Sequence, residues 1–223
     1  MRERLDNPKR LAFDFAVLMV ALALFALAMV LSLQSDLGAS SWTVFHHGIS
    51  LQTPLTLGTA GIIVGLLILV SSWAMGIKPG IGTLANMLFI GIWTDVYLEF
   101  ELIPKAAWLP AQLAMLVGGV VLLGFATALY IKTGFGAGPR DAFMLALTRR
   151  TNIRVGIIRW AMEITVVVIG ILLGGSFGIG TLIFAALIGP SVDFFFNIFG
   201  IRTRAGDTQR ARRLSRLRRA QAE

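Results

Sequence analysis

The sequence predicts an all-α polytopic membrane protein: six transmembrane helices in two inverted three-helix repeats, each with a short re-entrant or interfacial helix. Three observations support this prediction, namely the composition, six long apolar stretches and an internal repeat. The 223 residues are 56% hydrophobic and only 14% charged, with a mean hydropathy of +0.78. Soluble domains are about 45–50% apolar and about 25% charged, so this chain is expected in a lipid bilayer.

Six apolar stretches are long enough to cross the hydrocarbon core, which takes about 20 helical residues. The expected spans are 11–33, 56–75, 81–100, 108–131, 155–174 and 179–200. The first is too long for the apolar core of a signal peptide, so it is expected to remain as a helix. Two further stretches, 38–51 and 136–150, are too short to cross and are expected to form two or three helical turns each.

The net charge of +8 resides in the two ends of the chain. Residues 1–10 carry +2 and residues 201–223 carry +6, whereas residues 11–200 hold eight bases and eight acids. With the N-terminus inside, every basic cluster falls on one side of six spans, as the positive-inside rule requires. Both termini are therefore expected in the cytoplasm, with the basic ends attracted to anionic lipid headgroups. No motif supports nucleic-acid binding.

The second half of the chain repeats the first at a constant offset of 98 residues. Gly80–Leu84 matches Gly178–Leu182 with five identities in a row, and the register needs no gap from residue 35 to residue 193. The other matches are Gly38-Ala39 with Gly136-Ala137, Phe45 with Phe143, Gly58 with Gly156, Ile90-Gly91 with Ile188-Gly189, and Asp95 with Asp193. Three spans per copy invert the second copy, an arrangement that recurs in secondary transporters.

These features divide the chain into four parts. They are a cytoplasmic basic N-terminus (1–10), membrane repeat 1 (11–107), membrane repeat 2 (108–200) and a cytoplasmic Arg-rich tail (201–223).

The two short segments begin with residues typical of helix starts. Gly138 is expected at or near an N-cap with Pro139 in the first turn, and Ser40 or Ser41 is expected to cap the other segment. Two positive dipole ends facing a central cavity would favour an anion or a carboxylate. The alternative is that both segments lie flat at the interface as connectors. The candidate substrate-binding residues are Gly38, Ser40, Ser41, Trp42, Gly136, Gly138, Pro139, Arg140 and Asp141.

Charged residues inside spans are costly and usually face the bundle interior. Glu163 follows Arg159 at i+4 in the fifth span, which fits either an ion pair that fixes packing or a coupling carboxylate for a proton or cation. Asp95 and Asp193 occupy equivalent positions in the third and sixth spans, which fits either helix-end contacts or gates on opposite sides. Weaker polar candidates are Asn86 and Gln112.

Several kinds of chemistry are not expected. The chain has no cysteine, which excludes disulfides and Cys-ligated zinc. His46 and His47 are adjacent and do not share a helix face, so they form a poor metal pair. The stretch GFGAGPRDAF lacks the Gly-Lys-Ser/Thr ending of a nucleotide-hydrolysing loop. No cofactor or metal is expected, and without a nucleophile–base pair the chain is not expected to be an enzyme.

Some of these motifs resemble the YczE/YyaS/YitT group of bacterial integral membrane proteins. The resemblance is carried by Leu37-Gly38-Ala39 with Trp42, by Gly136 through Asp141, and by Gly178 through Thr181 followed by Gly189-Pro190. It covers most of residues 11–200 and implies a multi-pass protein of the bacterial inner (plasma) membrane. It supplies no substrate.

The function expected from these features is a small-solute transporter or permease with a site between the repeats. Its substrate and coupling ion are not identified by the sequence. The alternative is a non-transporting membrane scaffold or accessory subunit that assembles with another protein or with copies of itself, which would suit the small size and short loops.

Overall fold

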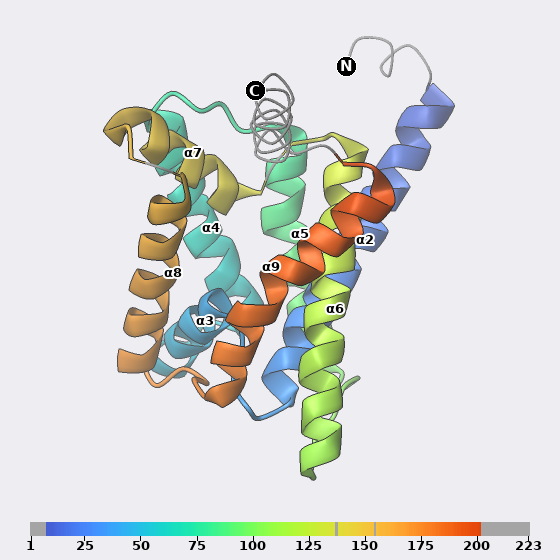
Figure 1. Ribbon diagram of the computed structural model, residues 1–223, viewed down its shortest axis with the longest axis vertical. Coiled ribbons are helices and arrows are strands. Elements are labelled where there is room, and N and C mark those ends of the chain that lie inside the picture. Colours follow the sequence, from blue (N-terminus) through green and yellow to red (C-terminus); the bar gives the residue numbers. More distant parts are fainter. Residues whose placement is uncertain (1–7, 137, 154, 202–223) are drawn as a thin grey trace, which may run out of the picture.

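The computed structural model is a helical bundle and describes residues 8–136, 138–153 and 155–201 (Figure 1). These residues form eight helices and no strand, so the predicted all-α class is confirmed. The helices are α2 (Pro8–Gln34), α3 (Ser41–Gln52), α4 (Leu57–Ala74), α5 (Ile81–Glu99), α6 (Leu109–Thr133), α7 (Pro139–Thr151), α8 (Val155–Leu172) and α9 (Ile179–Phe199). The two basic ends predicted at 1–10 and 201–223 lie mostly outside the described residues, and so does Ala137.

Six helices run along the bundle, and the two short ones, α3 and α7, lie near its opposite ends (Figure 1). We name these ends the α3 end and the α7 end. Segments 34–57, 99–109 and 172–179 lie at the α3 end, and segments 74–81 and 133–136 lie at the α7 end.

Five helices are long and apolar enough to cross a membrane: α2, α4, α5, α6 and α9. Their bounds lie close to those of the predicted spans. The remaining predicted span forms α8, an 18-residue helix that contains Arg159 and Glu163 and is not one of the five. The number of crossings therefore remains a prediction.

Helices α2 and α6 pack against each other, with α5 on α2 and α9 on α6. One core cluster joins Ala28 of α2, Leu116 of α6 and Phe184 of α9. Gly119 allows a close approach of α6 to α2, because a Cβ there would lie 3.0 Å from the Ala28 carbonyl oxygen. Small residues at such contacts are typical of helices that pack within membranes.

Each short helix packs mainly against a helix of the other half: α3 against α8, and α7 against α4. Glycines permit the first of these contacts. A Cβ on Gly48 would lie 2.8 Å from the Gly170 carbonyl oxygen, and a Cβ on Gly170 would lie 2.7 Å from the Phe45 amide nitrogen. The two halves of the chain therefore interlock rather than form separate units.

Two local features of the backbone match between equivalent positions of the sequence repeat. The Gly82 amide donates to the Phe135 carbonyl at 3.0 Å, and the equivalent Gly180 amide donates to the Leu37 carbonyl at 2.7 Å. Each bond joins one half of the chain to the other. The turns before the short helices match as well, since Gly38 has φ +113° and its counterpart Gly136 has φ +124°.

Alanine at Gly82 or Gly180 is expected to destabilise the protein by about 1–3 kcal/mol, the usual cost of overpacking. A Cβ at Gly82 would lie 2.7 Å from the Phe135 carbonyl oxygen, and a Cβ at Gly180 would lie 2.7 Å from that of Leu37. Thermal unfolding of purified variants in detergent measures the loss.

Gly118→Ala is the matched control, because a Cβ at this helical position meets nothing within 4 Å. It should be neutral or slightly stabilising, since alanine favours a helix over glycine by about 1 kcal/mol. Equal melting temperatures for all three variants would contradict the role given to the two backbone contacts.

Candidate functional site

The N-terminal ends of α3 and α7 meet inside the bundle. Trp42 is the second residue of α3 and Arg140 the second residue of α7. The Arg140 guanidinium carbon lies 4.3 Å from the centroid of the Trp42 ring. A cation over an indole face is attracted by the ring quadrupole. The two candidate segments that the sequence placed 98 residues apart are thus brought into direct contact.

Local sequence explains where each short helix begins. Ser40 is the N-cap of α3, and its Oγ accepts a hydrogen bond from the Thr43 amide at 3.3 Å. Gly138 is the N-cap of α7 and Pro139 its first residue, where a missing N–H costs nothing. Both helix starts were predicted, including Ser40 as one of two possible caps.

Glu163 of α8 completes the contact between the two helices. The Trp42 Nε1–H donates to Glu163 Oε1 at 3.0 Å, and Trp42 is only 5% exposed. Glu163 also attracts the Arg140 guanidinium. One buried indole therefore contacts a carboxylate through its N–H and a guanidinium through its face. The predicted i+4 partner Arg159 is exposed, and Glu163 instead faces this interface.

Asp141 lies in the first turn of α7, where a carboxylate is favoured by the helix dipole. The hydroxyl of Tyr130, a buried residue of α6, lies beside the Asp141 side chain and the Gly138 backbone. Arg159 and Arg140 both attract the Asp141 carboxylate. We name Trp42, Tyr130, Arg140, Asp141 and Glu163 the charged centre.

Two polar residues beside the charged centre received little or no weight from the sequence. His46 of α3 is 3% exposed, and its Nε2 has no hydrogen-bond partner among the described residues. Its ring centroid lies 6.3 Å from that of Trp42. Asn86 of α5 borders Gly138, where a Cβ would lie 3.1 Å from the Asn86 Oδ1. In the sequence, each of these two residues could have been recognised as a polar side chain within a mainly apolar segment.

The other candidate residues have structural surroundings. Gly38 lies against the start of α9, where its Cβ would lie 2.6 Å from the Gly178 nitrogen. Gly136 makes the equivalent turn beside Thr83, whose Oγ1 would lie 3.5 Å from its Cβ. Ser41 is partly buried as the first residue of α3. No ligand-directed group is contributed by the two glycines.

Asp95 and Asp193 lie outside the charged centre and differ from each other. Asp95 accepts hydrogen bonds from the Gly58 amide at 2.7 Å and the Thr56 hydroxyl at 2.5 Å, at the start of α4. Asp193 is exposed near the end of α9. Identical residues at equivalent positions thus have different environments.

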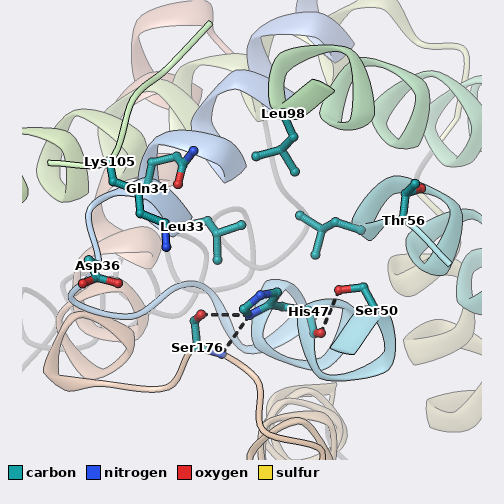
Figure 2. A pocket seen from close by; sticks show the side chains of 10 residues that line it. Leu33, Gln34, Asp36, His47, Ser50, Thr56, Leu98, Lys105 and Ser176 are labelled. Atoms are coloured by element: carbon teal, nitrogen blue, oxygen red, sulfur yellow. Dashed lines mark hydrogen bonds between the residues drawn. The ribbon is translucent and has the colours of Figure 1, made fainter. Parts of the chain in front are cut away.

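A cavity of about 370 Å³ opens at the α3 end (Figure 2). Its lining residues come from α2, α3, α4, α5 and the connecting segments: Leu33, Gln34, Asp36, His47, Ser50, Thr56, Leu57, Leu98, Lys105 and Ser176. None of these was a predicted site residue. Within the described part of the chain, no cluster of three or more His, Cys, Asp or Glu side chains is suited to a metal ion.

The apolar helices and their packing define the class of protein, an α-helical integral membrane protein. This chain belongs to a protein family of unknown function, DUF6198, whose model matches residues 12–197.

Relatives in two bacteria match most of the chain. An uncharacterized protein of Haemophilus influenzae is 35% identical over 187 residues, which cover 82% of this chain and 83% of that protein. The uncharacterized membrane protein YczE of Bacillus subtilis is 34% identical, with 83% and 84% covered. YyaS of the same organism, also uncharacterized, is 26% identical, with 80% and 90% covered. The predicted family resemblance is confirmed, and no solved structure matches the chain.

Arg140→Met is expected to destabilise the protein by about 3 kcal/mol or more, because it leaves nearby carboxylates without their partner. Adding Glu163→Gln should recover part of the loss, since it removes one of those carboxylates. Chemical unfolding of purified single and double variants in detergent measures this coupling.

Arg149→Met removes an exposed charge from the last turn of α7 and serves as the control. It should change stability by no more than about 0.5 kcal/mol. Strictly additive effects of Arg140→Met and Glu163→Gln would argue against a coupled charged centre.

Proposed function

We propose that this protein is a small-solute permease that works by alternating access, with the charged centre on the path of the solute. The meeting of α3 and α7 at Trp42 and Arg140 supports this function. In carriers built from inverted repeats, broken helices near the bilayer midplane form the substrate site. Non-helical backbone at that depth is tolerated only where it is buried in protein or lines a cavity.

The proposed topology has six crossings, including α8, with both termini in the cytoplasm of a bacterial cell. The bases Lys9, Arg10, Lys78, Lys132, Arg149 and Arg150 belong to segments at the α7 end, whereas Lys105 belongs to the α3 end. The positive-inside rule then orients the α7 end toward the cytoplasm. Three crossings in each half make the two halves inverted copies.

The observation that carries the proposal is a difference between two equivalent contacts. Helix α4 packs against α5, and the α4–α5 contact is made by Gly58, Gly91 and Asp95. A Cβ on Gly91 would lie 2.7 Å from the Gly58 carbonyl oxygen, while the Gly58 amide donates to Asp95. This contact lies toward the α3 end.

The equivalent residues of the second half are Gly156, Gly189 and Asp193, and the last two do not make the same contact. A Cβ at Gly189 meets nothing within 4 Å, and Asp193 is exposed. Among the described residues, α8 does not pack against α9 as α4 packs against α5. Helices α4 and α5 are thus in contact in the first half, whereas the equivalent helices α8 and α9 of the second half are apart.

An inverted repeat supplies the second state of such a carrier. In that state α8 and α9 would form the contact through Gly189 and Asp193, and α4 and α5 would separate. The two states would be built from the same residue types, so their free energies would be similar. A carrier needs two states within a few kcal/mol of each other, because its solute must shift their populations. A scaffold has no need of a second state.

The topology is tested by reporters fused after residue 52 and after residue 151, at the ends of α3 and α7. The first should report the outside and the second the cytoplasm, because each half is expected to have the opposite orientation. Alkaline phosphatase and a fluorescent protein provide complementary readouts. Signals on the same side would contradict the inverted arrangement.

Asp95→Asn and Asp193→Asn are expected to shift the two states in opposite directions. Hydrogen bonds to a charged group contribute about 1.5–3 kcal/mol, so the population ratio should change about 10- to 100-fold. The chain has no cysteine of its own. Single cysteines at the equivalent positions Ile62 and Trp160 therefore report each contact when the purified protein in detergent is labelled with a hydrophilic maleimide.

Asp95→Asn should increase labelling at position 62, because Ile62 packs on Gly91 in the α4–α5 contact. It should decrease labelling at position 160. Asp193→Asn should have the opposite effect, with less labelling at position 62 and more labelling at position 160. Unchanged labelling in both variants, with a modest loss of stability, would contradict alternating access and favour the scaffold.

A further inference from the structure

Two opposite charges line the cavity at the α3 end without pairing. Asp36 follows α2 and Lys105 lies in the segment between α5 and α6. Both residues are exposed, and among the described residues neither side chain has an ion-pair or hydrogen-bond partner. Figure 2 shows both beside the same hollow, on the side opposite Thr56. An unpaired base on the α3 end is notable because the proposed topology places few bases there.

His47 adds a hydrogen-bond donor to this cavity. The Ser176 amide, which can only donate, points at His47 Nδ1 at 3.2 Å, and Ser176 Oγ lies 2.8 Å from the same nitrogen. Nδ1 must therefore accept, which places the proton of the neutral imidazole on Nε2. The ring lines the cavity, so this donor and the Lys105 amine are both available to a carboxylate.

Gln34 adds an acceptor. Its Nε2 donates to the Ile103 carbonyl at 3.0 Å, and its Oε1 has no hydrogen-bond partner among the described residues. Together with the Asp36 carboxylate, this oxygen suits an ammonium group. Leu33, Leu57 and Leu98 supply apolar surface between the polar groups. A volume of about 370 Å³ is adequate for a small metabolite.

We propose that this cavity binds a zwitterionic small molecule that carries one carboxylate and one ammonium group. Lys105 and His47 contact the carboxylate, and Asp36 and Gln34 contact the ammonium. A simple anion would be repelled by Asp36, and a simple amine would be repelled by Lys105. Only a ligand with both charges pairs both residues.

The inference deepens the proposed function and rests on it for the statement that the bound molecule is the transported solute. Helix α3 separates the cavity from the charged centre, since His47 lines the cavity while the adjacent His46 lies buried beside Trp42. The cavity is then the first site that a solute meets on the outer face.

Binding is tested on the purified full-length protein in detergent, with thermal unfolding as the readout at constant ionic strength. The probes are glycine, β-alanine, 4-aminobutyrate and 5-aminovalerate, which separate the two charges by increasing distances. Valerate and pentylamine each lack one of the charges. At least one zwitterion should raise the melting temperature in a saturable manner, and neither single-charge analogue should do so.

Three variants locate the binding site. Lys105→Gln and Asp36→Asn should each weaken binding of the active zwitterion at least tenfold. Asn suits position 36, where the backbone has φ +58°, because Asn tolerates this left-handed conformation. Lys78→Gln, an exposed base of the α7 end, is the control and should leave the affinity unchanged.

Several results would overturn the proposal: no zwitterion binds, valerate or pentylamine binds equally well, or Lys78→Gln weakens binding as much as Lys105→Gln. The labelling of positions 62 and 160 distinguishes a failure of the zwitterion site from a failure of the proposed permease function. Zwitterion binding without any change in labelling would retain the site and contradict transport. Opposite shifts for the two aspartate variants without zwitterion binding would retain transport and contradict the ligand class.

Discussion

The need to satisfy backbone polar groups away from water governs this fold. The chain leaves regular helix twice inside the bundle, just before α3 and just before α7, and each break frees carbonyl groups. The starts of α5 and α9 likewise carry amides without intrahelical partners. Two reciprocal bonds satisfy both needs, because Gly82 donates to Phe135 and Gly180 donates to Leu37. Glycine is required at both amides, since a Cβ would collide with the accepting residue.

These bonds fix where each short helix begins relative to the opposite half, and the charged centre follows from that placement. Trp42 ties α3 to α8 through Glu163, and His47 ties α3 to the segment after α8 through Ser176. Helix α7 packs mainly on α4. The bundle therefore contains two crossed units, α3 with α8 and α7 with α4, which meet where the Arg140 guanidinium covers the Trp42 ring.

Under the proposed function, the differences between the halves would represent one of the two states of the carrier. The α4–α5 contact is formed near the α3 end, and the cavity with Lys105 and His47 lies at that same end. The equivalent contact of α8 with α9 is absent among the described residues. In the proposed permease, a solute in the cavity would be separated from the charged centre by α3, and its passage would require the unit of α3 and α8 to move relative to α4.

The sequence by itself determined the helical class and the five helices that are apolar enough to cross, because these depend on local hydropathy. It also determined where α3 and α7 begin, because this depends on which residues satisfy the free amides of a helix start. It also related Asp95 to Asp193. Only the tertiary structure decided that Asp95 caps α4 while Asp193 is exposed, and that Lys105 and His47 share a cavity. Equivalent residues in the two halves favour the same local structure. Whether α4 contacts α5 or α8 contacts α9 therefore depends on the packing of the whole bundle. Residues far apart in the chain form a cavity only when that packing brings them together.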